Sequence, residues 1–213
     1  MDLRHYIDHT LLRPDATQKD IARLCKEAIE HQFYAVCINP GHLAFAKAQL
    51  QNSAVKLATV VGFPLGASTT AIKVYETRDA INRGADEIDM VINIGALKEG
   101  DYSLVNQDIK EVREAAEGKV LKVIFENCYL SDEEKRIACR LCLENEVDYI
   151  KTSTGFGSSG ATYDDVHLMK AEVGDQLKIK ASGGIRDRLT AEKYIELGAD
   201  RIGTSSAATF INT

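Results

Sequence analysis

The sequence predicts a (β/α)8 barrel that spans residues 1–213 as a single domain. Three observations favour this fold. Short β-branched runs alternate with longer amphipathic stretches, as expected for parallel strands joined by crossover helices. Gly84-Ala85-Asp86 and Gly198-Ala199-Asp200 each lie between a helix pattern and a strand pattern, where a left-handed glycine can end the helix. Seven strand patterns and a weak first one give the eight units of a closed barrel.

The expected elements follow one another along the whole chain. The strands are expected at Tyr6–Thr10, Ala35–Ile38, Lys56–Val61, Glu87–Ile92, Lys119–Phe125, Val147–Lys151, Leu177–Lys180 and Arg201–Gly203. The helices are expected at Thr17–His31, Gly41–Gln51, Thr69–Arg83, Tyr102–Glu117, Asp132–Glu144, Tyr163–Val173 and Ala191–Leu197. Ser131 and Glu134 match a capping box, and Asp15 or Thr17 can cap the first long helix. A doubly wound open sheet is the alternative arrangement of such elements.

The composition is that of an ordinary globular protein. Hydrophobic residues make up 45% of the chain and charged residues 27%, which allows a large buried core. The formal net charge of −6 comes from interspersed acids and bases, so a basic face for nucleic acid is not expected. No apolar run approaches the roughly 18 residues of a membrane helix, and the first residues do not resemble a signal peptide. We therefore expect a cytoplasmic protein that binds neither nucleic acid nor membranes.

The cysteines and histidines do not form a metal-binding pattern. Cys139 and Cys142 spell C-x-x-C, but they fall inside the helix expected after Ser131, which favours two buried residues on one helix face. The five histidines are scattered, without H-x-H or H-x-x-x-H spacing. The sequence predicts no metal site.

One glycine motif resembles a nucleotide-binding pattern. Residues 155–160 match G-x-G-x-x-G after a strand. That pattern also requires an acidic residue about twenty positions later, where this chain has Lys178-Ile179-Lys180. The preceding strand would also have to bury Lys151. We therefore expect these glycines to form a loop that faces the substrate.

Three expected strands carry charged residues where apolar residues are usual. Asp89 lies in the middle of one strand, and Lys151 and Lys180 lie near the ends of two neighbouring strands. Taken singly, each could be a solvated strand end or a loop cap. Together they would place two ammonium groups and a carboxylate at the end of the barrel where active sites lie. A second ammonium group and partial burial would free one lysine amine for imine chemistry, and the carboxylate could transfer protons.

The loops after the last two strands favour phosphate binding. They read Ala181-Ser182-Gly183-Gly184-Ile185-Arg186 and Gly203-Thr204-Ser205-Ser206-Ala207. Paired glycines let the backbone approach an anion, and Ser205 or Ser206 would begin a last helix with free N–H groups. These loops usually bind phosphate in (β/α)8 barrels, although glycine turns of an ordinary barrel would also fit the pattern.

Several of these segments strongly resemble deoxyribose-phosphate aldolase, a class I Schiff-base aldolase family. The resemblance is carried by Glu87–Asn93, by Lys151-Thr152-Ser153-Thr154-Gly155-Phe156 and by the two phosphate loops. It extends to residues 7–12, 37–40, 62–66 and 122–126, and therefore covers nearly the whole chain in one order.

This resemblance implies reversible cleavage of 2-deoxy-D-ribose 5-phosphate to D-glyceraldehyde 3-phosphate and acetaldehyde, in deoxyribonucleotide catabolism. It assigns the Schiff base to Lys151, the lowering of its pKa to Lys180, and proton transfer to Asp89. Spacing alone does not decide which lysine forms the imine. No metal or organic cofactor is expected, because the imine supplies the electrophile. The family often forms homodimers, so a homodimer is an open expectation.

The resemblance also implies which residues contact the substrate. Asp8, Thr10 and Cys37 would line the sugar end of the site. The phosphate would be surrounded by Gly155, Gly183, Gly184, Gly203, Ser205 and Ser206. Two features differ from some relatives: Phe156 stands where they have a phosphate-binding lysine, and the chain ends at Phe210-Ile211-Asn212-Thr213 without their terminal tyrosine. We expect both differences to affect rate and phosphate affinity and to leave the reaction unchanged.

Two other functions remain open at this point. A phosphate-binding barrel isomerase could use Asp89 as a base without forming an imine. A sensor could bind a sugar phosphate in the same barrel without converting it. Resistance to borohydride in the presence of substrate would favour the isomerase, and tight ligand binding without product would favour the sensor.

Overall fold

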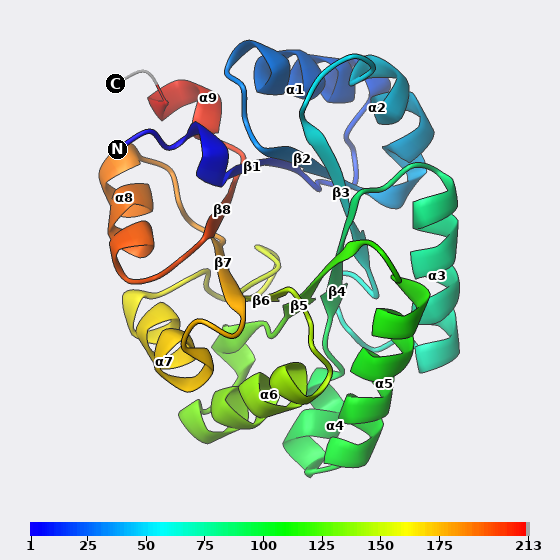
Figure 1. Cartoon of the computed structure of the whole chain (residues 1–213), viewed down its shortest axis with the longest axis vertical. Helices are drawn as coiled ribbons and strands as arrows, with labels where there is room; N and C mark the ends of the chain where they lie inside the picture. The colour runs from blue at the N-terminus through cyan, green and yellow to red at the C-terminus, as the bar shows by residue number, and fades with distance from the viewer. Residues whose placement is uncertain (212–213) are drawn as a thin grey trace.

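The computed structural model contains a closed barrel of parallel strands in the order β1 to β8, surrounded by helices (Figure 1). It describes residues 1–211. The strands are β1 (Ile7–Leu11), β2 (Ala35–Ile38), β3 (Lys56–Val61), β4 (Glu87–Val91), β5 (Val120–Ile124), β6 (Tyr149–Lys151), β7 (Lys178–Ser182) and β8 (Arg201–Thr204). The ring closes where β1 pairs with β8, with Asp8 opposite Gly203. The predicted fold class is therefore confirmed.

Helices follow the strands and cover the outside of the barrel (Figure 1). The longer helices are α1 (Gln18–Glu30), α3 (Thr70–Asn82), α5 (Tyr102–Ala115), α6 (Asp132–Glu144), α7 (Tyr163–Val173) and α8 (Arg188–Glu196). The shorter helices are α2 (Leu43–Gln49), α4 (Ile94–Glu99) and α9 (Ala207–Phe210), and three 3-10 turns lie at Arg4–Tyr6, Pro40–His42 and Asn127–Tyr129.

Helix ends follow the sequence signals, with one helix added. Thr17 and Ser131 each complete a capping box at the start of α1 and α6. Gly84 and Gly198 take φ values of 100° and 104° just after α3 and α8, as the turn before each strand requires. Helix α4 was not expected, because its six residues are too few for a hydrophobic period to appear in the sequence.

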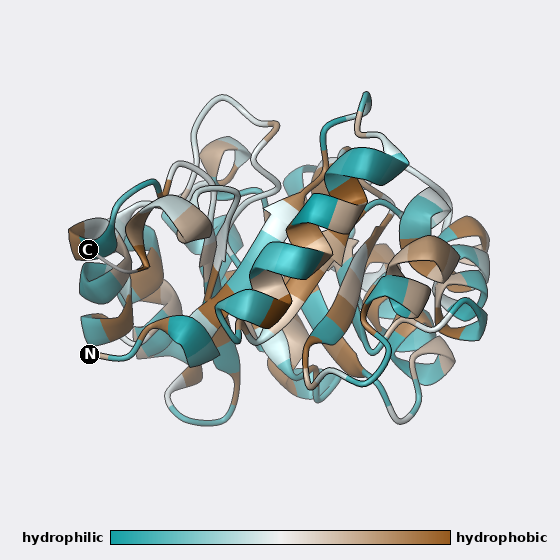
Figure 2. Cartoon of the chain, turned by 90° about the horizontal axis from the view of Figure 1, so that it is seen from above, coloured by the Kyte–Doolittle hydropathy of each residue, from teal (hydrophilic) through white to brown (hydrophobic). Residues whose placement is uncertain are grey.

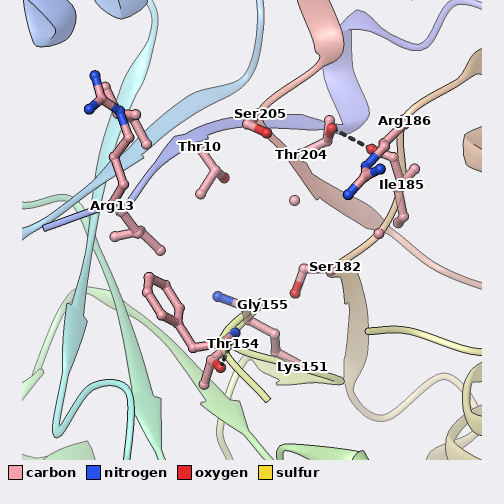
Figure 3. Close-up of a pocket in the computed structure, with 16 residues that line it drawn as sticks. Thr10, Arg13, Lys151, Thr154, Gly155, Ser182, Ile185, Arg186, Thr204 and Ser205 are labelled. Carbon is pink, nitrogen blue, oxygen red and sulfur yellow. Dashed lines mark hydrogen bonds between the residues drawn. The ribbon is translucent and has the colours of Figure 1, made fainter. Parts of the chain in front are cut away.

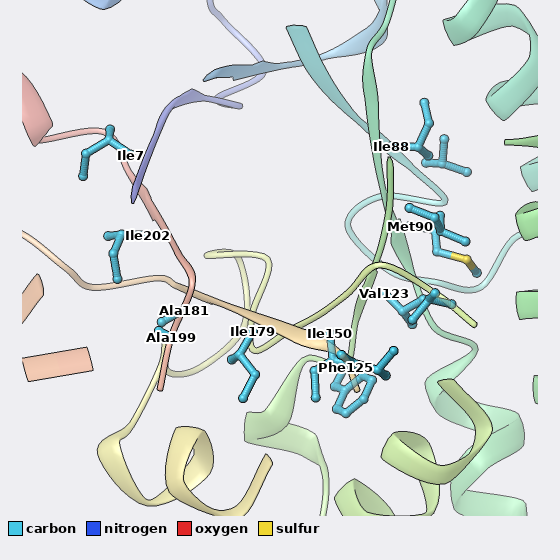
Figure 4. Close-up of a cluster of buried hydrophobic side chains, with 14 of the residues drawn as sticks. Ile7, Ile88, Met90, Val123, Phe125, Ile150, Ile179, Ala181, Ala199 and Ile202 are labelled. Carbon is cyan, nitrogen blue, oxygen red and sulfur yellow. The ribbon is translucent and has the colours of Figure 1, made fainter. Parts of the chain in front are cut away.

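The main hydrophobic core lies between the barrel and its helices. Side chains on the outer faces of the strands, such as Ile88, Met90 and Val123, are fully buried and point away from the lumen (Figure 4). The helices of Figure 2 alternate between hydrophobic and hydrophilic residues around their axes, so that one side can pack against the strands. Cys139 and Cys142 of α6 lie in this core, as predicted.

The lumen of the barrel is divided into an apolar and a charged side. On the apolar side, Cys37, Ala58 and Val60 of β2 and β3 pack with Leu12 in a small separate cluster. The remaining strands bring charged side chains into the lumen, and these form the site described below. Within residues 1–211, no helix is long and apolar enough to cross a membrane. Asn212 and Thr213, the last residues of the chain end that differs from some relatives, lie outside the described residues.

Candidate active site

Asp89 lies at the centre of a buried group of charged side chains inside the barrel. Its Oδ1 accepts a hydrogen bond from Lys122 Nζ at 2.7 Å. Its Oδ2 accepts hydrogen bonds from Lys151 Nζ at 2.9 Å and Lys180 Nζ at 2.8 Å. Burial raises the pKa of the Asp89 carboxyl, but the three ammonium groups outweigh burial and hold that pKa well below its usual value. Asp89 is therefore a carboxylate, and three lysines share its charge.

The pleat of the strands explains why these groups converge. Successive side chains of a strand point to opposite faces, so Glu87 and Asp89 face the lumen while Ile88 and Met90 face the helices. Lys151 and Lys180 pair in register on β6 and β7, which places their side chains next to each other. All three charged residues identified in the sequence therefore meet inside the barrel.

Lys151 and Lys180 differ in the number of carboxylates that they contact. Lys180 Nζ lies 2.5 Å from Asp8 and 2.8 Å from Asp89. Burial lowers the pKa of Lys180, but these two carboxylates outweigh it and raise that pKa above the ordinary lysine value. Among the described residues, Lys151 forms an ion pair with Asp89 alone, at 2.9 Å. Burial lowers the pKa of Lys151, and the charge of Lys180 lowers it further. The arrangement makes Lys151 easier to deprotonate than Lys180.

Asp8 and Cys37 lie beneath the surface that a substrate could reach. Asp8 is fully buried and bridges Lys180 at 2.5 Å and Arg201 at 2.8 Å. Cys37 is also fully buried, and burial raises the pKa of its thiol. Neither residue lines the cavity, whereas Thr10 does. The three residues expected at the sugar end therefore lie at different depths.

A cavity of about 310 Å³ opens among the loops that follow the strands (Figure 3). Lys151 belongs to its wall, whereas Asp89 and Lys180 lie behind it. The wall is formed by Thr10–Arg13, Lys151, Thr154–Phe156, Ser182–Arg186 and Gly203–Ser205. Lys151 is thus the lysine of the charged group that a substrate can reach.

The wall formed by the loops after β7 and β8 is suited to an anion. Gly183 and Gly184 have φ values of 89° and 81°, which favour glycine. A Cβ on Gly183 would also lie 2.8 Å from Cα of Gly160, so the two backbone segments leave no room for a side chain here. Gly155, Gly203 and Ser205 share this cavity wall.

Two arginines in the wall were not singled out from the sequence. Arg186 lies on the β7 side (Figure 3), and no carboxylate of the described residues forms an ion pair with it. Arg13 lies on the other side, where its guanidinium group pairs with Asp15 at 2.7 Å and Asp20 at 2.8 Å. The charge available for an anion therefore comes from Arg186, which directly follows the Gly183-Gly184-Ile185 segment of the predicted phosphate loop.

Two residues discussed above for the anion site, Ser206 and Phe156, offer no hydrogen-bond donor to the cavity. Ser206 lies outside the cavity wall, and its N–H donates to Thr204 Oγ1 at 3.0 Å, so that N–H is not free. Phe156 is half-exposed at the rim and packs edge to face against Phe63, with 5.4 Å between ring centroids. The rim at Phe156 is therefore apolar.

The loop after β6 is held by a carboxylate, Glu126, that was not predicted from the sequence as a site residue. Glu126 is buried and accepts hydrogen bonds from the N–H of Thr154 at 3.2 Å and from its hydroxyl group. Thr154 Oγ1 in turn accepts from the N–H of Phe156 at 2.9 Å. These bonds fix the segment that follows Lys151 and so shape the cavity.

Three more charged residues lie in the lumen below Asp89. They are Glu87 of β4, Lys122 of β5 and Arg201 of β8, all almost fully buried. The sequence contained the same signal for them as for Asp89, namely a charged residue within an apolar strand. Only Asp89, Lys151 and Lys180 were singled out from the sequence, so Glu87, Lys122 and Arg201 were not predicted to join them.

A barrel that places one lysine amine in a cavity wall, beside a second lysine and a carboxylate, has chemical groups that suit an aldolase. Comparison with known proteins agrees with this class. Residues 3–206 match the model of the DeoC/LacD family aldolases. The deoxyribose-phosphate aldolase of Brevibacillus brevis is 54% identical over 211 residues, which cover 99% of this chain and 96% of that protein. The enzyme of the same name from Carboxydothermus hydrogenoformans is 56% identical over 209 residues, covering 96% and 92%.

Solved structures give the same result. The structure of "QR15, an Aldolase" superposes with a TM-score of 0.96 at 42% identity, covering 100% of this chain and 95% of that one. The tetrameric deoxyribose phosphate aldolase of Aeropyrum pernix superposes with a TM-score of 0.89 at 32% identity, covering 99% and 89%. The chain therefore belongs to the deoxyribose-phosphate aldolase family and is an enzyme of the aldehyde-lyase class.

Proposed function

We propose that this enzyme reversibly cleaves 2-deoxy-D-ribose 5-phosphate to D-glyceraldehyde 3-phosphate and acetaldehyde through a Schiff base on Lys151. The observation that carries the proposal is the position of Lys151. It is the one lysine of the charged group in the cavity wall, and its amine is biased toward the neutral, nucleophilic form. The names of the relatives support the choice of substrate.

In the proposed mechanism, the Lys151 amine attacks the aldehyde carbon C1 of the open-chain sugar. The carbonyl oxygen takes up a proton, and loss of water leaves a protonated imine. Removal of the C3 hydroxyl proton then leads to cleavage of the C2–C3 bond. The bond must be C2–C3, because the two products contain three and two carbon atoms. The electron pair of that bond moves into the imine and forms an enamine. Protonation of the enamine at C2 and hydrolysis release acetaldehyde and restore Lys151.

The charged group behind Lys151 supports the proton transfers that these steps require. Asp89 Oδ2 contacts both Lys151 Nζ and Lys180 Nζ, at 2.9 Å and 2.8 Å. Lys180, which is charged, can donate a proton through water in the cavity to the substrate oxygen, and Asp89 Oδ2 can pass the proton that leaves Lys151 to the Lys180 amine in exchange. Because Asp89 is buried and both of its oxygens accept from ammonium groups, it is poorly placed to act alone as the base of an isomerase.

The phosphate group is proposed to bind at Gly183, Gly184, Gly203 and Ser205, with Arg186 as the charged partner. Gly155 would close the site from the loop after β6. An unpaired guanidinium group next to exposed backbone N–H groups is a suitable arrangement for a phosphate. We further propose that the protein is cytoplasmic and works without a metal or organic cofactor.

Borohydride trapping tests the imine directly. The enzyme is incubated with 2-deoxyribose 5-phosphate and borohydride, and its peptides are mapped by mass spectrometry. We expect a reduced adduct on Lys151 and none on Lys180. A folded, ligand-binding protein that forms no adduct would instead be an isomerase or a sensor.

The phosphate site has a separate test in Arg186→Ala. Loss of one charge-assisted hydrogen bond costs roughly 1.5–3 kcal/mol, so KM for the phosphorylated sugar should rise about tenfold or more. Cleavage of free 2-deoxyribose should change little, and Arg13→Ala is the matched control because Arg13 is already paired. Equal losses with both sugars would contradict the assignment.

A further inference from the structure

Glu87, Lys122 and Arg201, called here the lower charge group, lie in the lumen and do not line the cavity. A substrate in the cavity cannot touch them. Their exposed fractions are 1%, 0% and 2%, so they are also closed to bulk water. Burying three charged side chains is costly unless they are paired, and the mechanism above gives them no part.

The lower charge group is connected to the two carboxylates that contact the catalytic lysines. Lys122 Nζ lies 2.5 Å from Glu87 and 2.7 Å from Asp89. The guanidinium group of Arg201 lies 2.8 Å from Asp8 and 3.5 Å from Glu87. Each carboxylate next to Lys180 therefore also contacts at least one cation of the lower charge group.

Arg201 is held in place by two aromatic rings. Its guanidinium carbon lies 3.5 Å from the centre of the Tyr34 ring, and its NH2 donates to the Tyr149 hydroxyl at 3.0 Å. Burial raises the pKa of the Tyr149 hydroxyl, so that this group stays neutral. A guanidinium group does not lose its proton in proteins, and Arg201 is thus a fixed positive charge.

The numbers of acids and bases in the lumen are unequal. Three carboxylates, Asp8, Glu87 and Asp89, face four bases, Lys122, Lys151, Lys180 and Arg201. Cys37 cannot supply the missing negative charge, because burial keeps its thiol neutral. Lys122 and Lys180 each contact at least two carboxylates, and Arg201 also contacts two. Lys151 is the one base of this group that contacts a single carboxylate, so it is the base that loses its proton most easily.

We infer that the lower charge group sets the protonation state of Lys151, with Glu87 and Arg201 as positioning residues that act in opposite directions. Glu87 favours the charged form of Lys151, and Arg201 favours the neutral form. Both act through Asp8, Asp89 and Lys122 and never touch the substrate. The catalytic consequence rests on the proposed role of Lys151, but the effect on its protonation does not.

Titratable groups surround Lys151 from every strand of the barrel except β3. The titratable groups around it are Asp8 of β1, Cys37 of β2, Glu87 and Asp89 of β4, Lys122 of β5, Tyr149 of β6, Lys180 of β7, Arg201 of β8, and Arg13 and Arg186 at the cavity. Strand β3 faces the lumen with Ala58 and Val60, which do not titrate.

The test measures the titration of Lys151 directly. Protein labelled with ¹³C at the lysine Cε atoms is titrated by NMR, and the Lys151 signal is assigned by its loss in Lys151→Met. Glu87→Gln removes a negative charge with little change of shape and should lower the Lys151 midpoint by about one pH unit. Arg201→Met should raise it by about the same amount. The double variant should return close to the wild-type midpoint, and Arg201→Lys, which keeps the charge, is the matched control.

The outcomes separate this inference from the proposed function. Shifts of the two single variants in the same direction, or no shift in either, would overturn the inference. If Arg201→Met does not fold, the effect of Arg201 can still be measured in the Glu87→Gln background. It is then the rise of the Lys151 midpoint from the Glu87→Gln variant to the double variant. The pH dependence of kcat/KM should follow the NMR midpoints. Opposite NMR shifts in an enzyme that traps no imine would reject the proposed function and leave the inference standing.

Discussion

This molecule contains two buried clusters of charged side chains, and they have different effects on the pKa values of their members. One is the pair of Lys73 on α3 and Asp108 on α5, which lies outside the barrel among the helices. The other is the charged lumen around Asp89. Both are almost completely closed to water, so the difference between them comes from the number of partners that each group has.

In the helix cluster, one ammonium group faces one carboxylate. Lys73 Nζ donates to Asp108 and to the carbonyl oxygen of Val91 at 2.9 Å. Burial lowers the pKa of Lys73 and raises the pKa of Asp108. For both groups, the effect of burial is larger than the attraction between the two charges. A single partner therefore does not fully compensate for the loss of hydration.

In the lumen, most groups have more than one partner. Asp89 contacts three ammonium groups, and its pKa falls well below the usual value. Lys180, with two carboxylates, has a raised pKa, whereas Lys151, with one, has a lowered pKa as Lys73 does. The number of carboxylates around a buried lysine therefore decides whether its pKa is raised or lowered. Lys151 differs from Lys73 in that it reaches a cavity.

The largest expected effect separates these two lysines by activity. Lys151→Met should reduce kcat/KM by several orders of magnitude, because the nucleophile is removed. Lys73→Met should retain most of the activity per folded molecule, since Lys73 contacts neither the cavity nor the lumen charges. Steady-state kinetics measure kcat/KM for both variants, and circular dichroism gives the folded fraction of each. Equal losses of activity per folded molecule would show that Lys151 has no special role compared with Lys73.

The next effect concerns stability. Lys73→Met leaves Asp108 buried without its partner and should lower the free energy of unfolding by about 3–5 kcal/mol. The double variant Lys73→Met/Asp108→Leu should lose much less, because both charges are replaced by apolar groups. Urea denaturation measures all three proteins. A double variant as unstable as the single one would show that the pair itself contributes to stability.

A smaller effect is expected in acid. The folded-state pKa values of Asp8 and Asp89 are depressed, so their contribution is present above the unfolded value of 3.8 and is lost as pH falls below it. One such group can contribute about 2–3 kcal/mol at neutral pH. The pKa of Asp108 is raised, and its contribution has the opposite sign. Urea midpoints between neutral pH and acid should therefore fall less steeply in Asp89→Asn than in the wild type, and an identical slope would contradict this assignment.

The smallest expected effect is a shift of the pH profile in Lys180→Met. Removal of this cation leaves Lys151 nearer to uncompensated carboxylates, so its pKa should rise by about one unit or more. The rising limb of kcat/KM against pH should move to higher pH by the same amount. An unchanged limb in a folded variant would show that Lys180 does not set the charge of Lys151.

Much of the fold could be predicted because its signals are local. The bounds of β2, β3, α6 and α7 agree with the expected ranges, and the other expected elements differ by a few residues at their ends. Helix α4 was missed because one and a half turns leave no period to detect. The convergence of Asp89, Lys151 and Lys180 was predicted from strand alternation and is confirmed, whereas their catalytic roles remain proposals.

Local sequence patterns predicted eight strands and glycine-rich loops at the strand ends near Lys151, but they left an open sheet as the alternative to a closed barrel. Only the tertiary structure decided how many carboxylates each lysine meets, because Asp8, Glu87, Arg201 and Lys122 come from four separate strands. It also placed Asp8 and Cys37 beneath the cavity and Arg186 in its wall. Local patterns fix which face of a strand is buried, but the charge state of a buried group depends on all of its neighbours in space.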